Sequence, residues 1–379
     1  GPPTVMAMAT PAMLPVPTRE ARPMAKAWKE EMPPSWSSAL EREPVISLTM
    51  SPKCRNWTPR ERMELTANTA YWNPARRPKV ERVVLIPMPE ATSRLAALLG
   101  GQVDWIEAPP SDALAQLRSR GMQIVSNVYP HNWTWHFSRL EGSPWNDIRV
   151  RKAANLAVDR AGMVELLGGM MVPAKGMVPP TSPWFGKPAF EVKTDVEAAK
   201  KLMAEAGFST SKPLAVKAII SPSGSGQMQP LVMNELIQQN LADIGIKVDF
   251  EVMDWNTLVT SWRAGAKDPA SRGAHSTNSS YFSQDPFTAL IRHLDSSLVP
   301  PKGTNWGFYS DPDMDARFAA IRAAFEPAAQ LAAVQKAHEK FVDDALFLFV
   351  AHDVAPRALS PRVKGFVQAQ NWYQDICPV

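Results

Sequence analysis

Cysteine is scarce in this 379-residue chain, which carries only Cys54 and Cys377. Two cysteines so far apart match neither the paired spacing of a zinc site nor a CxxC redox motif, and they leave open one disulfide. The sequence also lacks the HExxH pattern of zinc proteases, the GxSxG turn of α/β hydrolases and a phosphate loop ending in GK[ST]. We therefore expect no metal, no cofactor and no catalytic residue.

Strong charge and long apolar runs are missing as well. The 41 Lys and Arg residues nearly balance 37 Asp and Glu residues, and the net charge of +4 is spread along the chain. Nucleic-acid binders concentrate basic residues on one face or tail, so we expect no nucleic-acid partner. No apolar run reaches the length of a bilayer span, and the N-terminus lacks the charged start and apolar core of a signal peptide.

The sequence does contain an alternation of strands and helices. Its length favours two lobes rather than one small core. VERVVLIPM is apolar on both faces, which predicts a strand buried on both sides. Such alternation is typical of an α/β fold. The expected strands are 60–68, 80–88, 102–108, 122–129, 214–221, 246–255 and 346–354, and the expected helices are 90–101, 111–121 with Ser111 as N-cap, 195–208, 228–245, 256–265, 315–325 and 327–345.

The stretch NDIRVRKAANLAVDR, residues 146–160, predicts an amphipathic helix that covers a sheet. Asn146 or Asp147 supplies the N-cap. The spacing i, i+3, i+4, i+7, i+8 defines one apolar face of small residues. That face consists of Val150, Ala153, Ala154, Ala157 and Val158, while Arg149, Arg151, Lys152, Asp159 and Arg160 take the other sides.

Aromatic residues gather with polar ones in three segments that we expect to be loops: NWTWHF (132–137), YFSQDP (281–286) and NWGFY (305–309). Rings in the loops of an α/β scaffold are candidates for lining a ligand cleft, and local packing of loop tips is the alternative. We expect residues 266–312 to be rich in loops and the tail after 362 to be β-like. The candidate ligand-binding residues are Trp133, His136, Met177, Tyr281, Phe282, Asp285, Asn305 and Trp306.

Several motifs in order resemble a known family. They are WTPRERMELTANTAYWNP (57–74), VERVVLIPMPEATSRLAALLGGQVDWIEAPP (80–110), NDIRVRKAANLAVDRAGMV (146–164), VPP (178–180), AAKKLMAEAGF (198–208) and DPDMDARFAAIRAA (311–324). Together they resemble the bacterial extracellular solute-binding proteins of family 5, the oligopeptide- and dipeptide-binding type that serves ABC importers. The helix 146–160 is similar to the most recognisable helix of that family.

The resemblance implies a two-lobe α/β fold of the type II periplasmic binding proteins, cluster C. Residues 1–145 would be a remnant of lobe I, with 1–56 matching poorly, residues 146–355 lobe II, and 356–379 a return to lobe I. Family members carry a longer N-terminal part, so we expect lobe I to be incomplete.

The resemblance also implies a periplasmic monomer that is not an enzyme. It would enclose a peptide or oligosaccharide-like solute by hinge closure and deliver it to an ABC permease. In the family an acidic residue of one loop holds the amine of a peptide, and Asp285 is the plausible anchor here. An α/β hydrolase-like enzyme and a non-transport binding module are the alternatives.

Overall fold

The computed structural model describes residues 4–8, 53–128, 132–223, 228–281, 286–369 and 374–379. They form two compact units. The first unit runs to Val125 and resumes at Arg357, and the second runs from Ser126 to Pro356. The family resemblance predicts the first boundary at residue 146. The second unit starts earlier because the strand that follows pairs within its sheet.

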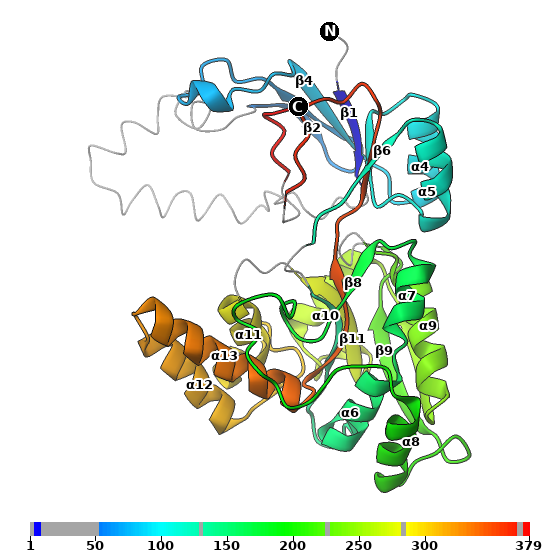
Figure 1. Ribbon diagram of the computed structural model, residues 1–379, viewed down its shortest axis with the longest axis vertical. Helices are drawn as coiled ribbons and strands as arrows, with labels where there is room; N and C mark the ends of the chain where they lie inside the picture. The colour runs from blue at the N-terminus through cyan, green and yellow to red at the C-terminus, as the bar shows by residue number, and fades with distance from the viewer. Residues whose placement is uncertain (1–3, 9–52, 129–131, 224–227, 282–285, 370–373) are drawn as a thin grey trace. The chain divides into compact units, whose positions relative to one another are not determined.

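The first unit contains a seven-stranded mixed sheet. Its strands are β1 (Thr4–Met8), β2 (Lys53–Thr58), β3 (Arg62–Thr66), β4 (Arg82–Pro87), β5 (Trp105–Glu107), β6 (Gln123–Val125) and β13 (Arg357–Leu359). Its helical elements are α4 (Ala91–Leu99), α5 (Leu114–Ser119) and the 3-10 turns η2 (Pro74–Arg76) and η3 (Ser111–Ala113). The spatial order is β2-β3-β4-β1-β5-β13-β6, and Figure 1 labels β1, β2, β4 and β6 of this sheet. The last of the described strands, β13, therefore lies between β5 and β6.

Both faces of that sheet are covered. Residues of α4 and α5 pack on Ile106 and Ala358, while the ring of Phe366 meets Trp105 edge-on on the other face at 4.8 Å between centroids. A buried ion pair joins neighbouring strands, since Arg357 Nε lies 3.1 Å from Glu107 Oε1. Among the described residues no disulfide joins Cys54 to Cys377.

The second unit contains a six-stranded sheet in the order β10-β9-β11-β7-β12-β8. Its strands are β7 (Asn132–Phe137), β8 (Met171–Pro173), β9 (Leu214–Ile220), β10 (Ile246–Val252), β11 (Ser276–Tyr281) and β12 (Phe347–Asp353). Its α-helices are α6 (Ile148–Ala157), α7 (Arg160–Leu166), α8 (Val196–Glu205), α9 (Pro230–Ala242), α10 (Trp255–Ala264), α11 (Pro286–Leu294), α12 (Pro312–Ala323) and α13 (Pro327–Asp343), and its 3-10 turns are η4 (Pro144–Asn146), η5 (Pro269–Ser271) and η6 (Ser296–Leu298).

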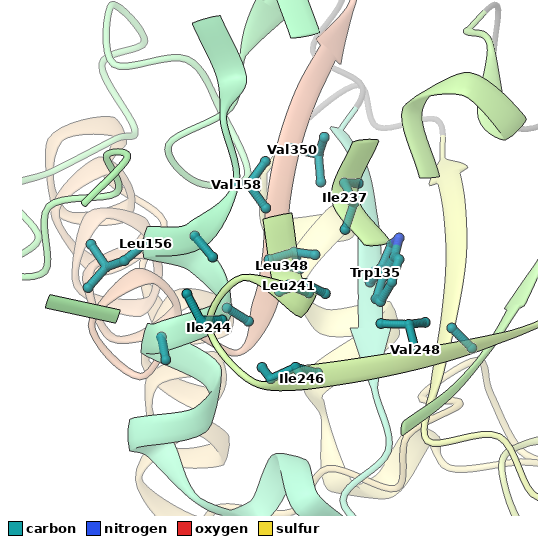
Figure 2. Close-up of a cluster of buried hydrophobic side chains, with 14 of the residues drawn as sticks. Trp135, Leu156, Val158, Ile237, Leu241, Ile244, Ile246, Val248, Leu348 and Val350 are labelled. Atoms are coloured by element: carbon teal, nitrogen blue, oxygen red, sulfur yellow. The ribbon is translucent and has the colours of Figure 1, made fainter. Parts of the chain in front are cut away.

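The helices of the second unit form a layer on each face of this sheet. On one face, α6 to α9 pack against Trp135, Leu348 and Val350, the cluster shown in Figure 2. On the other face, α11 to α13 pack against Phe347 and Phe349, with α10 in a neighbouring cluster. Because side chains alternate along a strand, β12 supplies both clusters from consecutive residues.

The predicted helix at 146–160 is present, with a break. Asp147 caps α6 by accepting a hydrogen bond from the Arg149 N–H, and the predicted apolar face is buried. The helix ends at Ala157, and Arg160 begins α7. Arg151 and Arg160, which the sequence pattern places outside the apolar face, are buried as well.

Both of these arginines are buried because backbone carbonyls satisfy their guanidinium groups. Arg160 donates to the carbonyl of Phe349 on β12 and, at 3.0 and 3.2 Å, to those of Asn155 and Val158. Arg151 donates to the carbonyls of Asp344 and Trp145, at 2.9 and 2.7 Å. Burial lowers the pKa of each to about 9, which leaves both charged at neutral pH.

Four other local predictions are corrected. Residues 132–137 form the strand β7 rather than a loop, and the region 266–312 includes β11 and α11. Ser111 starts a 3-10 turn whose N-cap is Pro110, so it does not cap a helix. The described parts of the tail, 363–369 and 374–379, contain no strand and pack through side chains such as Phe366.

No helix among the described residues is both long enough and apolar enough to cross a lipid bilayer.

Candidate functional site

One edge of the second unit's sheet brings together strand ends from across the sequence. β11 is antiparallel to β7 and parallel to β9, and β12 is antiparallel to β7. The start of β7 therefore lies at the same edge as the ends of β9, β11 and β12. Tyr281 and His352 both pair with Asn132 at this level. In open α/β sheets, ligands bind beyond the carboxyl ends of the strands.

Polar side chains are buried at this edge. Asn132, Ser221, His352 and Asp353 are each 0% exposed, and Ser279 is 3% exposed. We call these five residues the polar edge. Within the described part of the chain, three of their atoms have no hydrogen-bond partner: Asn132 Oδ1, Ser221 Oγ and Ser279 Oγ. A buried polar atom without a partner costs about 1–3 kcal/mol, so such atoms mark places where water or a ligand group binds.

The amide of Asn132 has a defined orientation. Its Nδ2 donates to the Gly176 carbonyl at 2.8 Å. Because a carbonyl only accepts, the nitrogen must face Gly176, and Oδ1 faces the other way as a free acceptor.

Asp353 is held locally, since its Oδ1 accepts from the Ala355 N–H at 2.6 Å. The Asn127 N–H donates to the Val354 carbonyl at 2.9 Å, which joins the first and last parts of the second unit.

A pair of histidines lies deeper on the same face of the sheet. The ring of His136 stacks on Phe347, with 4.2 Å between centroids, and meets His293 edge-on at 4.7 Å. The ring centroid of Trp262 on α10 lies 5.4 Å from that of His293. Burial lowers the pKa of His136 well below its usual value, with a further contribution from His293, and burial lowers that of His293 to about 3. Both rings are therefore neutral at neutral pH and act as packing groups.

The structure separates most of the predicted ligand-binding residues. Trp133 and His136 share β7 but lie on opposite faces of the sheet. Met177 is fully buried in the cluster of α11 to α13. Trp306 packs beside Ile219 and Leu258, and Trp262 joins that cluster.

Two of these residues also make hydrogen bonds with a structural role. Trp306 donates from its indole nitrogen to Ser271 Oγ at 3.1 Å. Asn305 closes a turn: its Oδ1 accepts from the Tyr309 N–H at 3.0 Å, and its Nδ2 donates to the Tyr309 carbonyl at 2.7 Å. The indole N–H of Trp133, in contrast, has no acceptor in the described residues.

Three predicted residues belong to the segment that follows β11. Tyr281 is the last residue of that strand, opposite Asn132, which places its backbone at the polar edge. Phe282 and Asp285 lie outside the described residues. Ligand contact by any of the eight predicted residues stays a prediction.

The polar edge is not among the sites predicted from the sequence. A signal was present in STNSSY, a run of hydroxyl and amide side chains that forms a central strand. Polar residues that fill a strand flanked by others on both sides have to be satisfied internally, by water or by ligand. Among the described residues, no group of three or more His, Cys, Asp or Glu side chains is arranged to hold a metal.

Comparison with solved structures identifies the fold. The chain superposes on the periplasmic binding protein DppA from Helicobacter pylori, in complex with the peptide STSA, with a TM-score of 0.72 and 19% identity, covering 88% of this chain and 64% of that one. The dipeptide-binding protein from Pseudoalteromonas sp. SM9913, in complex with Met-Leu, gives 0.71 and 20%, covering 89% and 67%. These likenesses confirm the predicted two-lobe α/β class.

Sequence comparison gives the family. Periplasmic oligopeptide-binding protein OppA of Escherichia coli (strain K12) is 26% identical over 324 residues, which cover 82% of this chain and 56% of OppA. Probable di/tripeptide-binding protein 5 of Pseudomonas aeruginosa is 26% identical over 316 residues, covering 83% and 57%. The chain thus spans just over half the length of these relatives. The model for "Bacterial extracellular solute-binding proteins, family 5 Middle" matches residues 14–297, well over half of the sequence, so this chain belongs to family 5 of the bacterial extracellular solute-binding proteins.

Proposed function

We propose that the protein is the substrate-binding component of an ABC importer and that it captures peptides. Its relatives include oligopeptide- and di/tripeptide-binding proteins, and the solved structures that share its fold hold the peptides STSA and Met-Leu. The observation that carries the proposal for this chain is the polar edge, where buried oxygen atoms lack partners.

The chemistry of the polar edge fits a peptide. Asn132 Oδ1 is an acceptor, and the hydroxyl groups of Ser221 and Ser279 both donate and accept. A peptide presents alternating N–H donors and carbonyl acceptors, which satisfy both kinds of group. No charged pair is required for backbone recognition of this kind. An oligosaccharide offers hydroxyl groups of both kinds and is the competing ligand class.

The same proposal covers the cellular role. The protein binds and delivers its ligand to a membrane permease without chemical change, as a monomer in the periplasm. The relatives support this location, since OppA is named as periplasmic. Enclosure of the ligand by hinge closure, expected from the resemblance, stays part of the proposal.

A thermal-shift screen tests the function. The purified chain is mixed separately with dipeptides, tripeptides, longer peptides and oligosaccharides. Heme and nickel–histidine complexes are included because one relative is named as a heme-binding protein and one solved structure with this fold holds Ni(L-His)2. A ligand at a hundredfold excess over its dissociation constant stabilises the folded state by about 2.7 kcal/mol. We expect one length class of peptides to raise the melting temperature.

One further measurement completes the test. Mass spectrometry of the bound peptide after incubation is expected to show it intact, and cleavage would favour the hydrolase alternative. If only a sugar, heme or nickel complex raises the melting temperature, the peptide assignment is wrong. If none of these ligands does so, the binding proposal itself is contradicted.

A further inference from the structure

The segment between β8 and α8 has no helix or strand from residue 174 to 190, yet its backbone is held in place by one helix. Side chains of α13 bind it at successive turns. Gln335 donates to the Pro183 carbonyl at 2.7 Å, Glu339 accepts from the Lys187 N–H at 2.9 Å, and Asp343 accepts from the Phe190 N–H at 2.8 Å. These bonds replace those that regular structure would supply.

His338 lies in the middle of this row and is fully buried. The Met177 N–H donates to its Nε2 at 2.9 Å, and its Nδ1 lies 2.8 Å from the Phe185 carbonyl. An N–H only donates and a carbonyl only accepts, so Nε2 must be unprotonated and Nδ1 must carry the hydrogen. Both ring nitrogens are therefore committed to the backbone of the segment, and only the neutral ring satisfies both bonds.

The contact between this ring and Gly176 is close. A Cβ atom at Gly176 would lie 2.6 Å from His338 Cε1 and 2.7 Å from Nε2, nearer than any real Cβ contact. The absence of a side chain thus lets the backbone lie against the imidazole. The carbonyl of the same residue accepts from Asn132 Nδ2 at the polar edge. A continuous path runs from the ring through Gly176 and Met177 to the amide of Asn132.

We propose that His338 is a positioning residue for the polar edge: it fixes the backbone at Gly176 and Met177, which orients the Asn132 amide so that Oδ1 is presented to a ligand donor. This inference rests on the proposed function, because it names the ligand group as an N–H or O–H donor. Burial also lowers the pKa of the His338 ring to about 4, which keeps it neutral in the periplasmic pH range.

The test compares three variants. His338→Ala removes both bonds. His338→Gln keeps an acceptor and a donor on one side chain and is the conservative replacement. Gln335→Ala is the matched control, because it removes a bond from the same helix to the same segment without touching the path to Asn132.

Two readouts apply to each variant. The first needs no ligand: the side-chain amide signals of Asn132 in ¹⁵N NMR spectra, together with hydrogen exchange over residues 174–178. We expect His338→Ala to move or broaden those signals and to speed exchange, and His338→Gln and Gln335→Ala to leave them close to wild type. The second readout is affinity for the peptide class found in the thermal screen. We expect a loss of about tenfold in His338→Ala, roughly what 1.4 kcal/mol represents, with recovery in His338→Gln.

The outcomes separate the two proposals. Unchanged Asn132 signals in a folded His338→Ala variant would overturn the positioning role, whatever the ligand. So would altered signals with unchanged affinity. If His338→Ala does not fold, the result for His338→Gln decides, since unchanged Asn132 signals and affinity support the role and a defect in both overturns it. If the wild type binds none of the tested ligands, the proposed function fails, and the Asn132 signals alone decide whether His338 orients the amide.

Discussion

The two faces of the second unit's sheet are made from the same strands and do different things. On the face toward α9, β7 and β12 contribute Trp135, Leu348 and Val350, which pack in a continuous apolar cluster (Figure 2). On the face toward α11 to α13, the intervening residues include Asn132, His136 and His352. One face is held by a single apolar cluster, while the other combines the apolar cluster around Phe347 and Phe349 with buried polar side chains near the strand ends, some without partners in the described residues.

The largest loss of stability is expected from a substitution on the apolar face, the one toward α9. Leu348→Ala removes a fully buried side chain from the middle of that cluster and is expected to lower the free energy of unfolding by about 2–5 kcal/mol. Urea unfolding followed by circular dichroism measures the change. The exposed Val252→Ala, on the edge strand β10, is the matched control, with an expected change within about 0.5 kcal/mol. Equal effects of the two changes would contradict the division into faces.

The second-largest loss of stability is expected on acidification, through histidines buried in α11 and α13. Burial depresses the pKa of His338 to about 4 and of His293 to about 3, below the unfolded value of 6.5. The unfolded chain therefore binds more protons than the folded one below pH 6.5, and stability falls as pH drops toward 4. For the His338 ring, whose pKa falls from 6.5 to about 4, the loss of stability is roughly 3 kcal/mol.

Unfolding measured at pH 7 and pH 4.5 checks this effect, and His338→Gln serves as the comparison. The variant should lose less stability between the two pH values, because the titrating ring is gone. An equal loss of stability between pH 7 and pH 4.5 in wild type and variant would show that His338 does not contribute to the pH dependence of folding.

A smaller effect separates two hydroxyl groups that face each other across β7 and β11. Thr134 Oγ1 donates to the Leu348 carbonyl, whereas Ser279 Oγ has no partner in the described residues. We expect Thr134→Val to lower stability by about 1 kcal/mol, and Ser279→Ala to leave it unchanged or raise it slightly. A comparable loss in both variants would mean that Ser279 is satisfied by an ordered water.

The smallest stability effect is expected at Ser221→Ala, again at an atom without a partner. Here the informative measurement is ligand affinity. A loss of about threefold to tenfold with an unchanged melting temperature would place Ser221 in contact with the ligand. Unchanged affinity would remove this residue from the proposed site.

The elements that the sequence predicted well are those with a local signal. The spacing of Val150, Ala153 and Ala157 indicated α6 and its buried face, because helical periodicity depends on neighbouring residues. The family resemblance supplied the two-lobe class. The burial of Arg160 could not be predicted from neighbouring residues, since its partner, the Phe349 carbonyl, lies far along the chain.

The candidate site was harder to predict, because pairing rather than composition creates it. NWTWHF and STNSSY contain too many polar residues to look like central strands. They become strands because β7 lies between β11 and β12, which makes all three backbones satisfy one another. The unmatched atoms of Asn132 and Ser279 emerge only once the register is known. Trp133 and Trp306 are predicted to bind ligand because they are aromatic, and the structure shows that both are buried.

The position of β13 has a consequence for the order of events during synthesis. This strand lies between β5 and β6, yet residues 357–359 leave the ribosome only after residues 126–356 of the second unit have been made. Until then β5 and β6 have no strand between them. The second unit, whose Asn127 and Val354 are hydrogen-bonded neighbours, holds every strand of its own sheet by that time. Nascent-chain folding should therefore reverse the usual N-terminal-first order, with the later-made unit completed before the earlier one.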